Sequence, residues 1–89
     1  MNMDIIKKEI REILSEYTDL DVSRIGDQDL LFDDWAMTSV VIVQVFVTIQ
    51  EKYGISMQDE VNMQAPVSIQ YIAEIVMEKI NRKEEPVLN

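Results

Sequence analysis

The side chains that most often perform chemistry near neutral pH are missing from this chain. Among its 89 residues there is no His and no Cys, so the usual general base and the usual thiol nucleophile are both absent. Carboxylates, lysines and tyrosines remain, but no Gly-rich phosphate loop and no cluster of metal ligands accompanies them. The sequence therefore predicts a protein without enzymatic activity and without a metal site, in which any reactive group is attached from outside.

The hydroxyl of Ser39 is the group best placed to receive such an attachment. It follows Thr38 and begins a stretch, 39–53, that lacks Gly and Pro and has an apolar period of 3.6, so Ser39 is expected at the start of a helix. A phosphate ester there would lie beside unsatisfied N–H groups and the positive end of the helix dipole, which favour an anion. Ser and Thr also cap helices in any protein, so on position alone a purely structural role stays open.

Four helices are expected to position this hydroxyl. They cover residues 3–17, 39–53 with Gly54 ending the helix, a short stretch 58–64, and a last segment from Pro66 or Ser68 to about Asn81. The segment 18–38 has no period, but its scattered apolar residues predict a long loop that packs on the core. We therefore expect an all-α four-helix bundle, with residues 1–81 as a single domain and 82–89 as a flexible C-terminal tail.

The helix over 39–53 has an unusual surface. Its predicted buried stripe is Ile42, Val43, Phe46, Ile49 and Tyr53, and its predicted exposed face is Val41, Gln44, Val45 and Thr48. No charge appears on that face before Glu51. An uncharged, partly apolar face indicates docking by hydrophobic packing, whereas a helix that is apolar on most sides is usually a buried one, and both interpretations stay open.

The charge of the chain excludes several classes of partner. Asp and Glu number 17 against 8 Lys and Arg, which gives a net charge of −9. Such a field repels nucleic acid and anionic lipid, and it favours partners with basic surfaces. No run approaches the roughly 20 apolar residues of a membrane span, and the N-terminal residues do not read as a signal peptide. We expect a cytoplasmic protein that binds neither nucleic acid nor membrane; the residues do not determine its oligomeric state, for which a monomer is the expectation.

The run LFDDWAMTSVVIVQVFVTIQEKYGI resembles the acyl and peptidyl carrier proteins, and the resemblance extends over nearly the whole chain. In that family the loop closes with Leu-Gly-x-Asp-Ser-Leu, and the following helix ends with Phe-Gly-Ile or a near variant. Ser39 falls at the modified serine, and Tyr53-Gly54-Ile55 falls at the aromatic-Gly-Ile close. Three positions depart from the pattern. Thr38 replaces the family's Asp, Ala36 replaces its Gly, and Trp35 replaces an aliphatic residue.

The resemblance implies the function of a carrier protein with a four-helix acyl-carrier-like fold. It implies a covalent 4′-phosphopantetheine arm on Ser39, with Thr38 beside it, that holds acyl or aminoacyl groups as thioesters. It also implies three classes of partner: a phosphopantetheinyl transferase, a loading ligase or acyltransferase, and downstream synthase enzymes. The stretches LFDD and VQVFVTIQEKYG are similar to carriers that load D-alanine. A specialised biosynthetic pathway is expected ahead of housekeeping fatty acid synthesis, because Thr38 replaces the family's Asp and the exposed face of the second long helix lacks acidic residues. The cargo and the pathway stay open, as does the effect of Thr38 on priming by common transferases.

Further site residues are expected from the residue types and from the resemblance. Asp27, Asp29, Asp33 and Asp34 are expected to form a solvated acidic loop, and the resemblance implies that Asp33 and Asp34 face a basic partner enzyme. The other expected partner-binding residues are Trp35, Met37, Val40, Val41, Gln44 and Met63. An acyl chain is expected to lie between the helices near Phe46, Val61 and Ile72. The rival hypothesis is an unmodified helical interaction module, in which Ser39 is only a cap and the apolar face of the second long helix docks a partner.

Overall fold

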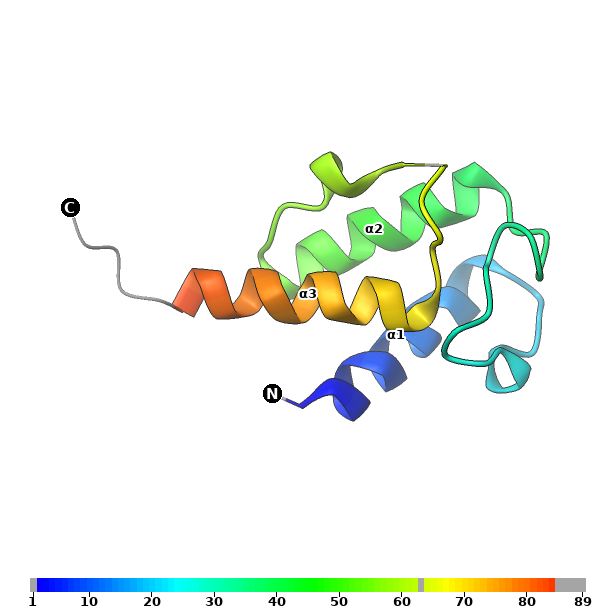
Figure 1. The fold of residues 1–89 in the computed structure, drawn as a ribbon, viewed down its shortest axis with the longest axis horizontal. Coiled ribbons are helices and arrows are strands. Elements are labelled where there is room, and N and C mark those ends of the chain that lie inside the picture. Colours follow the sequence, from blue (N-terminus) through cyan, green and yellow to red (C-terminus); the bar gives the residue numbers. More distant parts are fainter. Residues whose placement is uncertain (1, 63, 85–89) are drawn as a thin grey trace.

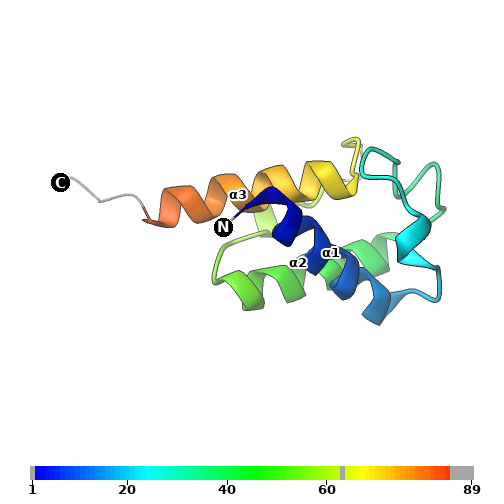
Figure 2. The same cartoon turned by 90° about the horizontal axis from the view of Figure 1, so that it is seen from below.

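The structure, a computed structural model, describes residues 2–62 and 64–84. These residues form three α-helices, two short 3-10 helices and no β-strand, as the predicted all-α class requires. The elements in chain order are α1 (Met3–Tyr17), η1 (Val22–Arg24), α2 (Ser39–Tyr53), η2 (Gln58–Glu60) and α3 (Ile69–Glu84). Helix α1 packs against both α2 and α3 and runs opposite to them (Figures 1 and 2). None of the helices in the described ranges is long and apolar enough to cross a membrane.

Local sequence signals set the ends of the helices. The left-handed conformation of Gly54, with φ 63°, ends α2 at the predicted residue. At the start of α3 the Ser68 hydroxyl accepts the N–H of Tyr71 at 3.0 Å, so Ser68 is the cap and Pro66 lies before the helix. Helix α3 continues past the predicted end at Asn81 to Glu84. The rest of the predicted tail, 85–89, lies outside the described residues.

The short helix predicted over 58–64 is reduced to the single 3-10 turn η2. Asn62 explains the early end, because its side-chain oxygen accepts the N–H of Gln64 at 2.9 Å and its carbonyl accepts the N–H of Ala65 at 3.2 Å. Such an Asn turn competes with helical hydrogen bonding. The four-helix bundle is therefore not confirmed, since the described residues contain three α-helices.

The core lies where the three helices meet. Four residues of α2 point into it with the spacing i, i+3, i+4 and i+7: Ile42, Val45, Phe46 and Ile49. Val45 has 0% of its surface exposed and Val43 has 38%, so the prediction that Val43 is buried and Val45 exposed was wrong. Nearly every position between residues 40 and 49 is apolar, so the pattern alone did not define the edge of the buried stripe.

The segment 18–38 covers the end of the bundle where α2 and α3 begin (Figure 1). Three of its apolar side chains enter the core, those of Ile25, Leu31 and Met37. The backbone N–H of Leu31 donates to the carbonyl of Val67 at 2.9 Å, which joins the segment to the irregular stretch of chain before α3. The segment is therefore held against the bundle by both apolar and polar contacts.

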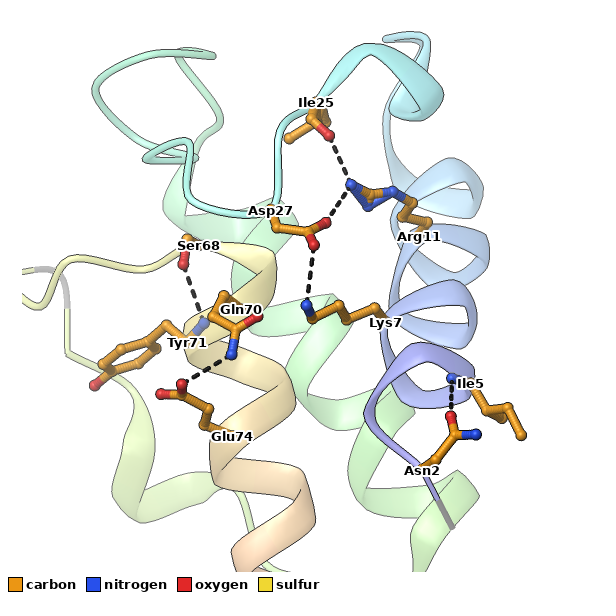
Figure 3. Close-up of polar contacts among 10 residues, drawn as sticks. All are labelled: Asn2, Ile5, Lys7, Arg11, Ile25, Asp27, Ser68, Gln70, Tyr71 and Glu74. Carbon is orange, nitrogen blue, oxygen red and sulfur yellow. Dashed lines mark hydrogen bonds and ion pairs between the residues drawn. The ribbon is translucent and has the colours of Figure 1, made fainter.

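Asp27 makes the main polar connection between this segment and the helices (Figure 3). Its carboxylate accepts from Lys7 Nζ at 2.9 Å and from Arg11 at 2.7 Å, both on α1. Arg11 also donates to the carbonyl of Ile25 at 2.7 Å. The backbone carbonyl of Asp27 accepts the N–H of Gln70, on α3, at 2.9 Å. We call this set of contacts the Asp27 clip, and it ties the segment to two helices at once.

We expect Asp27→Ala to lower the free energy of unfolding by about 1–2 kcal/mol, because Lys7 loses its partner and Arg11 keeps only the carbonyl of Ile25. Denaturant unfolding followed by circular dichroism measures this change. Asp33→Ala is the matched control, since Asp33 lies exposed in the same segment, and it should change stability by less than about 0.5 kcal/mol. Equal losses for the two variants would show that the clip does not stabilise the fold.

Candidate functional site

Ser39 is the first residue of α2 and its side chain is exposed. Thr38 is the N-cap of α2. Its hydroxyl oxygen accepts a hydrogen bond from the N–H of Val41 at 3.3 Å, and its backbone carbonyl accepts one from the N–H of Ile42 at 3.3 Å. In the described part of the chain, the N–H groups of Ser39 and Val40 have no hydrogen-bond partner. Two free amide donors and the positive end of the helix dipole therefore lie beside the Ser39 hydroxyl.

The electrostatic surroundings of this helix start suit an anion. The first turn of α2 contains no acidic residue. Thr38 supplies the side-chain cap without adding the negative charge that Asp would bring to the same place. A phosphate ester on Ser39 would accept hydrogen bonds from the free amides and meet no carboxylate in the first turn.

Acidic side chains form hydrogen bonds that hold the segment before α2. Asp29 accepts the indole N–H of Trp35 at 3.0 Å and the backbone N–H of Gly26 at 2.8 Å. These two hydrogen bonds hold the pKa of the Asp29 carboxyl below its ordinary value, and the bond from Trp35 has the larger effect. Asp34 accepts the N–H of Leu30 at 2.8 Å. With the Asp27 clip, three of the four aspartates therefore bind the chain itself, although Asp34 stays exposed to solvent as predicted and the Asp27 side chain is 42% exposed.

Asp33 is the one of these four aspartates that stays exposed without a partner among residues 2–62 and 64–84. Trp35 and Val41 are half-buried, while Val40 and Gln44 are exposed. Met37 is only 7% exposed and belongs to the core, so its predicted place on a partner-binding surface was wrong. Met63 lies outside the described residues.

A ridge of three valines forms the apolar part of the exposed face of α2. Val40 is 64% exposed and Val47 48% exposed, and the half-exposed Val43 lies between them at helical spacing. We call Val40, Val43 and Val47 the valine ridge. The ridge begins next to Ser39, so the apolar character of α2 reaches the surface and does not come only from burial.

The three residues predicted to line an acyl pocket differ in their burial. Phe46 and Ile72 are both buried in the packed core, whereas Val61 is 41% exposed. The volume that does open near Ser39 is a groove of about 370 Å³ between the end of α1 and the end of the loop, lined by Thr18, Asp19, Leu20, Trp35, Thr38 and Val41 among others. We call it the loop groove; no periodic or motif signal predicted it, because it joins segments distant in sequence.

Ala36 adopts the left-handed conformation, with φ 52°, directly before the site. It is the only residue other than Gly with positive φ in the described ranges. This is the position at which the carrier pattern has Gly, which takes that conformation without a steric penalty. The departure from the motif therefore places a strained residue at the close of the loop.

Comparison with known proteins gives one family. The family model described as a phosphopantetheine attachment site matches residues 8–67, a range that includes Ser39, the whole of α2 and the loop before it. No curated protein and no solved structure matched the chain significantly.

Ala36→Gly should raise the free energy of unfolding by roughly 0.5–1 kcal/mol. The relief of left-handed strain exceeds the added entropy of the unfolded chain. Thermal or denaturant unfolding measures the difference, and Ala65→Gly, at a position with ordinary φ, is the control that should be neutral or destabilising. If Ala36→Gly destabilised the protein as much as the control, the strain would be compensated by contacts of the methyl group.

Proposed function

Because the chain belongs to the phosphopantetheine attachment-site family, we propose that it carries acyl or aminoacyl groups as thioesters on an arm bound to Ser39. Members of this family carry a covalently attached 4′-phosphopantetheine. The observation that supports Ser39 as the attachment residue is its exposed position at the first residue of α2, inside the matched range. A serine buried in the core or in the middle of a helix would not be accessible to a transferase.

The residues around Ser39 fit the phosphate end of the arm. The amides of Ser39 and Val40 are placed to donate to a phosphodiester, and Thr38 fixes the helix start by capping it. The arm supplies a thiol that forms the thioester, a group that this chain lacks because it has no Cys. The roles of the protein are then to present the arm at an exposed helix end and to offer a surface that partner enzymes recognise.

We further propose that the protein has no catalytic activity of its own. Carriers of this family interact with phosphopantetheinyl transferases and with biosynthetic enzymes. For this chain we propose a transferase, a loading ligase or acyltransferase, and downstream synthase enzymes of a specialised pathway. The absence of His and Cys from the sequence supports this division of labour.

The valine ridge supports a second candidate function. An exposed apolar ridge on a surface helix is typical of a docking site for another protein. In that alternative Ser39 stays unmodified and caps α2 together with Thr38. The two candidates differ in one measurable property, the covalent state of Ser39.

Intact mass after co-expression with a promiscuous phosphopantetheinyl transferase tests the carrier function. The wild-type protein should gain the mass of one phosphopantetheinyl group, and Ser39→Ala should gain none. Ser56→Ala, which removes another exposed serine, is the control that should still be modified. An unmodified wild type with every transferase tested would favour the docking module, and an adduct on Ser39→Ala would move the attachment to another residue.

The valine ridge is expected to contribute to recognition by the transferase. Replacing Val43 and Val47 together by Ser should raise the KM of priming roughly tenfold with little change in kcat, because the loss of two partly buried valines corresponds to about 1.4 kcal/mol of binding. Ile5→Ser is the matched control, since Ile5 is an equally exposed aliphatic residue on α1, and its KM should stay unchanged. An unchanged KM in the double variant would show that the transferase does not use the ridge.

A further inference from the structure

The loop groove lies beside the proposed attachment residue. Thr38 precedes Ser39 and Val41 follows it in the first turn of α2, and both line the groove. Resting on the proposed function, we propose that the end of the arm folds back into the loop groove and that its cargo is an α-aminoacyl group, whose ammonium faces the carboxylate of Asp19. The groove then shields the thioester between encounters with enzymes.

The lining of the groove matches an arm of mixed polarity. Leu20 and Trp35 offer apolar surface to methylene groups, and Leu20 is among the exposed large apolar side chains of the chain. The hydroxyl oxygens of Thr18 and Thr38 each accept a backbone N–H, at 3.3 Å in both cases. Their hydroxyl hydrogens have no acceptor within the described ranges, so they are available to the amide carbonyls of the arm.

Asp19 gives the groove its charge preference. It is the only ionisable side chain in the lining, it is exposed, and it has no hydrogen bond or ion pair in the part of the chain that the structure describes. A carboxylate at this place attracts a protonated amine and repels an acyl group that ends in a carboxylate. This preference selects an aminoacyl cargo over an acidic one.

The packing of the core argues for a short cargo. Phe46 and Ile72 are buried in contact with the rest of the core, so a long acyl chain would have to displace packed side chains to enter between the helices. The loop groove is open already, and its volume of about 370 Å³ lies at the lower end of ligand pockets, which span roughly 300–1,000 Å³. A small aminoacyl group on the end of the arm therefore fits the space available without repacking.

Trp35 makes this proposal measurable, because it is the only Trp in the chain and it lines the groove. The probes are the holo-protein loaded with alanine through a stable amide in place of the thioester, and the same protein loaded with propanoate, which has the same chain length but no amine. Quenching of Trp35 fluorescence by acrylamide and the NMR shift of its indole N–H report occupancy of the groove. We expect less quenching and a shifted indole signal in the alanyl form, relative to the unmodified protein.

The charge preference is tested by the difference between the two cargoes. A single exposed ion pair should favour the groove-bound alanyl form over the propanoyl form by roughly two- to fivefold. Asp19→Asn should abolish this difference, and Asp33→Asn, an exposed aspartate outside the groove, should preserve it.

The possible failures are distinguishable. An adduct on Ser39 with unchanged Trp35 quenching and indole shift would overturn the groove proposal and leave the carrier function standing. Protection of Trp35 that is equal for both cargoes, or that survives Asp19→Asn, would overturn the preference for an amine. The absence of any adduct at Ser39 would overturn both the carrier function and this inference.

Discussion

The position of the site depends on the Asp27 clip. A segment of 21 residues, 18–38, joins α1 to α2 without an α-helix, and its conformation fixes where α2 begins. A single aspartate binds Lys7 and Arg11 through its side chain and Gln70 through its backbone, so α1 and α3 both hold the same point of the segment. The clip joins residues far apart in sequence, and ordering such a long connection carries an entropic cost that these contacts offset. The clip therefore anchors the segment that leads to the exposed Ser39.

The start of α2 combines two requirements that usually conflict. A helix start needs a side-chain cap, and an anion bound there needs the absence of negative charge. Thr38 meets both, because its neutral hydroxyl caps the helix. The aspartates of the loop are directed elsewhere: Asp29 binds Trp35 and Asp34 binds Leu30. These two aspartates thus hold the loop together, and Asp19 is the carboxylate that lines the groove beside the first turn of α2.

Local patterns predicted the three α-helices, but they did not predict the reduction of 58–64 to a 3-10 turn or the contacts between residues distant in sequence. The ranges of α1 and α2 and the end of α2 at Gly54 agree with the periodicity and the helix stop signal. The buried stripe of α2 was misplaced, because apolar residues occupy almost every position and only tertiary packing buries Val45 while leaving Val43 38% exposed. The roles of Asp27 and Asp29 depend on partners that folding brings near, which no local pattern contains. Ser39 was identifiable because helix phase, loop length and family motif coincide there.

The valine ridge has a consequence for the protein in a concentrated solution. Exposed apolar residues promote self-association, yet each chain has a net charge of −9 and repels its copies. At physiological ionic strength this repulsion extends over about 8 Å, whereas apolar attraction acts only near contact. Two copies of the protein therefore meet the electrostatic repulsion before their apolar surfaces come into contact. A partner with a basic surface meets no such repulsion. The valine ridge can therefore bind a partner with a basic surface without causing the protein to self-associate.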